Sequence, residues 1–549
     1  MHQLRYLASH SFWTVWLILT GVLLAIAGCF LRGPEVTTTR WNIPAPSRAG
    51  VVSSILLFLF LGGYIAMVLI GEDFATYDNS QFTAYSLRGI DFPVWVLPEG
   101  GRFYPLALQQ FNLIGHLTGS IAGYHLFQIL EMLAVTAILL VLDEQLSFAA
   151  RSVLAVIALS LPSMVISFTG LIYQESDVVF WLAGLVLSVR FYARTRSTWW
   201  GVLAVLCGQF ALYYKEPVFV FLLTFTGVRV LLRARSSGRF SEVLWNHETR
   251  LDLCLALSSL IFAAYYGIVI FPGTNLQYLA SRHLSPGETI LEYLRLDWLV
   301  CIFSGFTIWR FYRVFRGAAP PELIWDGLAA GGLAYFAAYL AMGLTSEYFL
   351  APVDLIAVLY LGRYVYLSWK AVKPRFRAAA AVLSLLVVCN NLDNSTYRVL
   401  QRKWTIKEKQ RITGAILERY RSDPQHPIKL YFPVTSEYNM AEYAAYLNYR
   451  GLTVEEDPPR SGQRPRVELY GANIRRDGPC VRWLPFVCHA GAEVLERITV
   501  ILPEDAFSST GFNAYRQAEE RLLPQKQGPS QPDLLFGAVQ LFRPGAFAF

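Results

Sequence analysis

Charged side chains are scarce in this sequence of 549 residues, since Asp, Glu, Lys and Arg make up 16% of it. A typical soluble chain has about 25%. Hydrophobic residues make up 54%, and they fall into blocks of about 20 residues, the length that crosses about 30 Å of hydrocarbon as a helix. The composition therefore excludes an ordinary soluble protein and predicts a polytopic membrane protein, for which we expect membrane lipids and no nucleic acid as partners.

Cysteine is also rare, with 7 residues in the chain. Five lie in or beside apolar blocks, and we interpret them as small packing residues: Cys29, Cys207, Cys254, Cys301 and Cys389. Cys480 and Cys488 could form a disulfide in an oxidising compartment, although their spacing alone does not establish the geometry. Neither CxxC nor HExxH occurs, so the sequence contains no recognisable transition-metal motif.

Length and apolarity predict twelve transmembrane helices in an all-α membrane protein. The predicted spans are 11–31, 50–71, 122–142, 152–171, 178–193, 199–213, 217–232, 252–271, 297–312, 323–343, 350–369 and 378–393. The first is too long for the apolar core of a signal peptide and contains two tryptophans, so we expect it to be retained.

The basic residues between these spans predict the orientation of the chain. With the spans alternating, one side collects Arg32, Arg40, Arg48, Arg194, Arg196, Arg233, Arg235, Arg239, Arg250, Arg313, Arg316, Lys370, Lys373, Arg375 and Arg377. By the positive-inside rule this side is cytoplasmic. The N-terminus and the segment after residue 393 then face outward. We expect a bacterial inner membrane with both termini in the periplasm, although an Asn-Ser-Thr glycosylation sequence at Asn394 does not distinguish this from the endoplasmic reticulum.

Three regions are predicted along the chain. Residues 1–49 would form an extra N-terminal helix and a cytoplasmic loop, and 50–393 the main membrane domain. Residues 394–549 alternate strand-like and helix-like segments, which predicts a small periplasmic α/β domain. The first large outer loop, 72–121, is broken by proline and glycine and becomes amphipathic, as interfacial helices do.

Four outward-facing segments carry ionisable residues at the ends of predicted spans: GEDFATYDNSQF, GRFYPL, YQESDVV and YYKEPVF. Taken singly, each could mark the water boundary or supply a structural ion pair. Their order along the chain indicates more. It resembles the order in polytopic glycosyltransferases of the C-type (GT-C) fold, which take sugars from polyprenyl or dolichyl phosphate.

The similarity is to the aminoarabinose-transferring and protein-mannosylating branches. Their first outer loop begins with an Asp-Glu pair and continues to RY…KPPL, and later outer turns carry Pro-Asp-x-Leu and TKGP. Here YDNSQFTAYSLRG, GRFYPLALQQF, YQESDVVFWLAGL and LYYKEPVFVF look like these motifs in turn, across about Val51–Phe221 and more weakly to residue 370. The chain departs from the pattern where Asn79 replaces the second acid, Tyr104 replaces a lysine and Glu347 replaces an arginine.

This resemblance implies an inverting transfer of sugar from a polyprenyl-phosphate donor to a hydroxyl of a glycan, lipid or protein acceptor. The leaving phosphate needs cations to hold its charge, and the candidates are Arg102, Lys215 and Arg282, with Tyr104 beside them. The acceptor hydroxyl needs a carboxylate base, for which Asp78 is the first candidate and Asp73 the second. A base on the face of the sugar opposite the phosphate implies inversion. Supporting roles are assigned to Glu175, Asp177, Glu216 and Tyr77.

No cofactor is expected to be required, although paired acids could hold a divalent cation. Two alternatives remain. A flippase or transporter of lipid-linked sugars would also need buried charges, but the ionisable residues gather at the outer ends of the spans rather than within them. An O-antigen polymerase or ligase would use a lipid diphosphate, and such enzymes usually have a late outer loop rich in Arg and His, whereas the charged outer loop here is early and acidic. A non-enzymatic scaffold would leave the ordered charges unexplained.

Overall fold

A computed structural model shows a mostly helical chain. It describes residues 11–33, 48–74, 79–97, 101–237, 243, 246–271, 285–369, 374–422, 428–433, 444–452, 454–456, 467–472, 481–484 and 487–489. Among them are seven helices long and apolar enough to cross a membrane, or eight if one bent pair counts as a single span. The protein is therefore a multi-pass α-helical membrane protein.

The chain divides into two compact units. The first, here called the helical unit, comprises residues 1–70, 92–114 and 122–399; the second, the mixed unit, comprises 71–91, 115–121 and 400–549. The seven apolar helices are α2 (Phe12–Phe30), α3 (Arg48–Leu69), α6 (Ile121–Leu142), α9 (Glu175–Thr195), α13 (His247–Val269), α17 (Leu323–Met342) and α18 (Ala351–Ser368), the last preceded by the 3-10 turn η5 (Glu347–Leu350).

The other five predicted spans also coincide with helices, and these are short, bent, charged or unusually long. They are α7 (Phe148–Leu159) with α8 (Pro162–Thr169), α10 (Thr198–Tyr214), α11 (Val218–Ser237), α16 (Trp298–Phe315) and α19 (Pro374–Ser422). Helix α10 has 17 residues, and α11 and α16 contain several arginines. The count of twelve spans stays a prediction.

The predicted span 152–171 is broken. Helices α7 and α8 meet at an angle of 70°, because Pro162 at the start of α8 has no N–H to continue the helical ladder. A break inside a membrane protein requires other partners for the freed carbonyl groups. The Ser395 hydroxyl of α19 donates to the Ser160 carbonyl at 2.6 Å, and the Gln128 amide donates to the Gly170 carbonyl at 2.7 Å.

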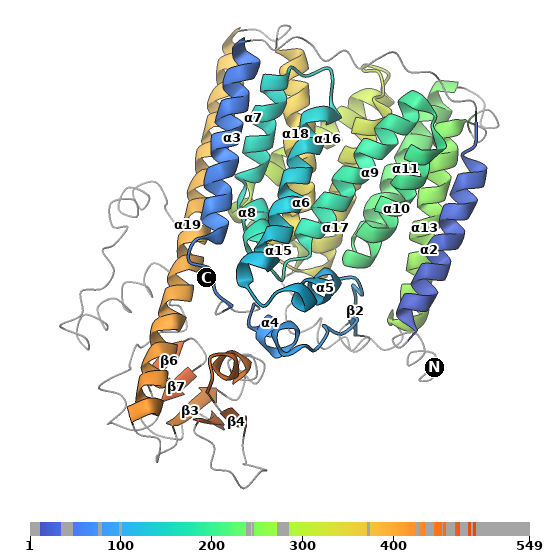
Figure 1. Ribbon diagram of the computed structural model, residues 1–549. Helices are drawn as coiled ribbons and strands as arrows, with labels where there is room; N and C mark the ends of the chain where they lie inside the picture. The colour runs from blue at the N-terminus through green and yellow to red at the C-terminus, as the bar shows by residue number, and fades with distance from the viewer. Residues whose placement is uncertain are drawn as a thin grey trace. The chain divides into compact units, whose positions relative to one another are not determined.

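Neighbouring helices in the helical unit run side by side in Figure 1. Helix α9 packs on α10, and α11 packs on α13 and α17. The α11–α17 contact is close because Gly331 has no side chain: a Cβ there would lie 2.9 Å from the Phe221 ring and 3.1 Å from the Phe221 carbonyl oxygen. Small residues permit such approaches between transmembrane helices.

Two elements differ from expectation. The outer segment 272–295, which the predicted spans leave as a loop, ends in α15 (Pro286–Leu296), which begins with a capping box between Ser285 and Glu288. Helix α19 continues to Ser422 over 49 residues, so the predicted domain boundary at residue 394 lies inside a helix.

The mixed unit contains α4 (Ser80–Ala84), η2 (Ser86–Arg88), the last part of α19, a short helix over 444–449 and a five-stranded sheet. The strands are β3 (Ile428–Pro433), β4 (Val454–Glu456), β5 (Val467–Ala472), β6 (Val481–Leu484) and β7 (Val487–His489), in the order β4-β5-β3-β7-β6. Strand β3 pairs in parallel with β5 and antiparallel with β7. Residues 490–549, the last part of the predicted α/β domain, and Cys480 lie outside the described residues.

Candidate functional site

Lys215 and Glu175 form a buried ion pair where α9 begins and α10 ends. Lys215 Nζ lies 2.7 Å from Glu175 Oε1, and the two side chains are 5% and 0% exposed. The ammonium also donates to Gln174 at 3.5 Å and lies 5.2 Å from the centre of the Phe349 ring. Lys215 itself is extended rather than helical, and the following Glu-Pro sequence favours this end of the helix because a residue before proline avoids the helical region.

Arg102 approaches the same loop from a small hairpin. Strands β1 (Val96–Leu97) and β2 (Arg102–Phe103) pair antiparallel, and the turn includes Gly101 with a positive φ of 65°, which glycine adopts without strain. Arg102 Nε donates to Glu216 Oε1 at 3.2 Å, and the Phe103 amide donates to the same oxygen at 2.8 Å. The guanidinium lies 4.8 Å from the centre of the Tyr104 ring, and the Arg102 side chain is 31% exposed.

The charges in this loop shift one another's pKa values. Burial on its own raises the pKa of Glu216, but the charges of Arg102 and Lys215 and the Phe103 amide outweigh it, so the pKa stays below its usual value. Burial on its own lowers the pKa of Arg102, but Glu216 reverses the effect and the pKa is raised. Both side chains are therefore charged at neutral pH.

Asp177 belongs to a second polar group, two residues further along α9. The Gln110 amide donates to both oxygens of Asp177 at 3.1 and 3.2 Å, and the Tyr214 hydroxyl donates to Gln110 at 3.2 Å. The side chain of Asp177 also lies near that of Glu131, which is 5% exposed in the middle of α6. Glu131 is not among the residues predicted from the sequence, although a single carboxylate within an apolar span is itself a signal of function.

A third polar contact joins the turn η5 to helix α19. Arg398 of α19 donates to the two oxygens of Glu347 at 2.9 and 3.1 Å. Nothing in the sequence links these two residues, which are 51 positions apart.

The predicted base candidates are only partly described. Asp73 lies in the mixed unit, where it accepts hydrogen bonds from Gln410, Tyr446 and Arg450. Asp78, Tyr77 and Arg282 lie outside the described residues. Of the predicted site residues, the helical unit contains Arg102, Tyr104, Lys215, Glu216, Glu175 and Asp177, and it brings the first five together around Glu216 and Lys215.

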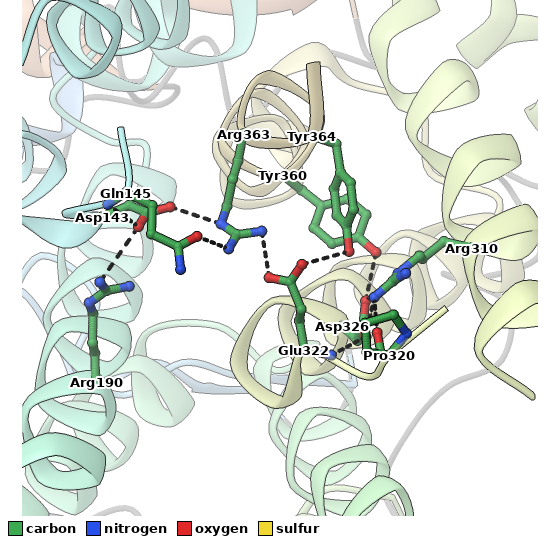
Figure 2. A network of polar contacts seen from close by, with 10 residues as sticks. All are labelled: Asp143, Gln145, Arg190, Arg310, Pro320, Glu322, Asp326, Tyr360, Arg363 and Tyr364. Carbon is green, nitrogen blue, oxygen red and sulfur yellow. Dashed lines mark hydrogen bonds and ion pairs between the residues drawn. The ribbon is translucent and has the colours of Figure 1, made fainter. Parts of the chain in front are cut away.

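Another polar network occupies the opposite ends of the helices and is shown in Figure 2. Arg363 bonds Asp143 at 2.8 Å, Glu322 at 2.5 Å and Gln145 at 2.6 Å. Beside it, Arg310 bonds Asp326 at 3.2 Å. These residues come from α16, α17, α18 and the loop after α6, so the network fastens these helices together. It contains none of the predicted site residues.

Among the described residues, no group of three or more His, Cys, Asp or Glu side chains is arranged to hold a metal ion. No family model matches this chain, and no curated protein matches it.

Proposed function

We propose that the protein is an inverting glycosyltransferase of the GT-C type that uses a polyprenyl-phosphate sugar. In this proposal the chain crosses a bacterial inner membrane twelve times. The ends of the helices near Lys215 face the periplasm and the arginine-rich ends face the cytoplasm. Residues 394–549 contribute a periplasmic α/β domain. The products would be glycans or glycolipids of the cell envelope.

The observation that best supports the proposal is the hydrogen bonding and exposure of the Arg102 guanidinium. Its guanidinium is anchored through Nε to Glu216, and among the described residues no other hydrogen bond to it is made. The side chain is about one third exposed, so the remaining N–H groups can reach an oxyanion in the forked geometry that suits phosphate. Lys215, the residue before Glu216, adds a second positive charge to the same loop.

The charges of these residues suggest the role of each in the proposed sugar transfer. A carboxylate, Asp78 in first place and Asp73 in second, takes the proton of the acceptor hydroxyl as its oxygen bonds to the anomeric carbon. The bond between that carbon and the phosphate oxygen breaks, and the electron pair leaves with the phosphate. Arg102 and Lys215 stabilise the negative charge that accumulates there. One displacement inverts the anomeric configuration.

The proposal is tested with purified protein and a synthetic polyprenyl-phosphate sugar, by measuring sugar transfer. We expect Arg102→Ala to raise the KM for the donor by at least tenfold, because a charged hydrogen bond to phosphate contributes about 1.5–3 kcal/mol. Arg235→Ala is the control, because this exposed arginine lies at the other end of the helical unit. Absence of transfer with every polyprenyl-phosphate sugar tried would refute the proposal.

A specific observation also favours the second candidate, a transporter of lipid-linked sugars. The neighbouring carboxyl groups of Glu131 and Asp177 are both buried, and buried ionisable groups of this kind serve as proton relays in transporters. Glu131 lies within an apolar helix and not at its outer end. Flipping of a lipid-linked sugar in proteoliposomes, lost in Glu131→Gln and without any transfer, would favour the transporter.

A further inference from the structure

The mixed unit contains a pocket of about 550 Å³. Its wall is formed by Glu72, Asp73 and Phe74, by the segment 119–121 and by Tyr449 and Arg450. These residues come from three parts of the chain: the segment after α3, the segment leading into α6, and the end of the short helix over 444–449. The volume lies in the range of about 300–1,000 Å³ that is usual for small-molecule sites.

Asp73 is held in one orientation at this wall and is 9% exposed. Gln410 Nε2 donates to its Oδ2 at 2.6 Å, the Tyr446 hydroxyl at 3.1 Å and Arg450 Nη1 at 3.4 Å. All three hydrogen bonds that the described residues make to this carboxylate end on Oδ2. Oδ1 therefore remains as an oriented acceptor for a hydroxyl group.

Both carboxylates of the pocket wall already have positively charged partners within the mixed unit. Glu72 bonds Arg402 at 2.8 Å and also contacts Lys403, while Asp73 bonds Arg450. An ionic ligand would have to compete with these pairs. A neutral ligand that donates and accepts hydrogen bonds would not.

Tyr449 supplies an apolar surface beside these polar groups. The residue is 46% exposed, and its ring meets Phe74 edge to face at 5.9 Å and 84° and lies 6.4 Å from the Tyr446 ring, so two neighbouring rings position it while part of its surface stays open. An exposed aromatic ring next to an oriented carboxylate and an arginine matches a ligand with an apolar C–H face and a rim of hydroxyl groups. Pyranose sugars have both.

We propose that this pocket binds a neutral sugar unit of the acceptor, so that the acceptor class is a glycan. The assignment of the sugar to the acceptor rests on the proposed glycosyltransferase activity, whereas the binding of a sugar does not. The ring would lie against Tyr449, one hydroxyl would donate to Asp73 Oδ1, and Arg450 would donate to another.

The test is saturation-transfer NMR on the full chain in nanodiscs, without glycoside detergents that would occupy the pocket. The probes are methyl β-glucopyranoside, methyl β-galactopyranoside and methyl β-glucuronide. We expect signal from at least one neutral glycoside, a reduction of at least fivefold in Tyr449→Ala and Asp73→Asn, and retention in Tyr449→Phe. Absence of signal from all three probes, signal from the glucuronide alone, or an unchanged signal in Tyr449→Ala would overturn the inference.

Two measurements separate this inference from the proposed function. If sugars bind as expected but no polyprenyl-phosphate donor supports transfer, the glycosyltransferase proposal fails and the pocket remains. If transfer occurs and Tyr449→Ala leaves the KM for a glycan acceptor unchanged, the pocket inference fails and the enzyme remains. We expect Tyr449→Ala to raise that KM about tenfold, equivalent to about 1.4 kcal/mol. A melting temperature equal to that of Tyr449→Phe excludes unfolding as the cause.

Discussion

Removing Lys215 separates its structural contribution from its proposed contact with the donor. In Lys215→Met, Glu175 would remain at 0% exposure without the ammonium that lies 2.7 Å from it. Breaking a buried ion pair in this way costs about 3–5 kcal/mol. Changing the partner as well, in Lys215→Met/Glu175→Gln, removes the stranded charge and is expected to restore most of the stability.

Sugar transfer is expected to respond differently. If Lys215 stabilises the leaving phosphate, the double variant has near wild-type stability but still uses the donor poorly. Thermal unfolding in nanodiscs measures the first effect, and kcat and KM for the donor measure the second. The matched control is Arg310 with Asp326, a pair of similar burial at the opposite ends of the helices. There, Arg310→Met/Asp326→Asn is expected to recover both stability and transfer.

Two results would refute this reasoning. Wild-type donor kinetics in Lys215→Met/Glu175→Gln would show that Lys215 serves only as an ion-pair partner. An unchanged melting temperature in the single variant Lys215→Met would show that the pair does not stabilise the folded protein.

Further outcomes follow from other residues. Asp78→Asn is expected to abolish transfer while donor binding, measured with a fluorescent polyprenyl phosphate, persists; full turnover would move the base to Asp73. Because the pKa of Glu216 is held below its usual value, its stabilising contribution is present at neutral pH and is lost as the pH falls below about 4.3, so Glu216→Gln should weaken the acid sensitivity of thermal unfolding. Arg363→Met removes the nearer arginine of Asp143 and leaves Arg190 at 3.5 Å, so it should cost less than the roughly 3–5 kcal/mol of a fully unpaired buried charge; a change below about 1 kcal/mol in unfolding experiments would contradict the network in Figure 2. Gly331→Leu forces α11 and α17 apart and should lower the yield of folded protein, whereas Gly227→Leu, with open space around it, should not.

The apolar blocks predicted the helices well because a bilayer demands long runs of one kind of residue, and every predicted span overlaps a helix. The bend at Pro162 was readable in principle, since proline interrupts a helix wherever it falls. The start of helix α15 was also marked in the sequence by Ser-Pro-Gly-Glu, which is typical of a helix N-terminus. The neighbouring charged residues nevertheless favoured a loop. The continuation of α19 to Ser422 could not be predicted from hydropathy, because the composition becomes polar near residue 393 while the backbone remains helical.

The candidate site was predictable only in its local part. Lys215 and Glu216 are adjacent in sequence, and the order of the four motifs predicted that Arg102 and Glu175 belong to the same site. The partnership of Glu131 with Asp177, and of Arg398 with Glu347, depends on which faces of distant helices meet, and hydropathy carries no information on that. Asp78, the first candidate for the base, lies outside the described residues, so its role stays a prediction.

The hydroxyl of Ser395 at the break between α7 and α8 decides where the chain can be shortened. Sequence composition suggests cutting near residue 393 to isolate the transmembrane portion. Such a cut would remove the Ser395 hydroxyl that donates to the Ser160 carbonyl and the Arg398 guanidinium that pairs with Glu347. A shortened protein that ends after residue 399 keeps both, and is the version to express when only the helical part is wanted.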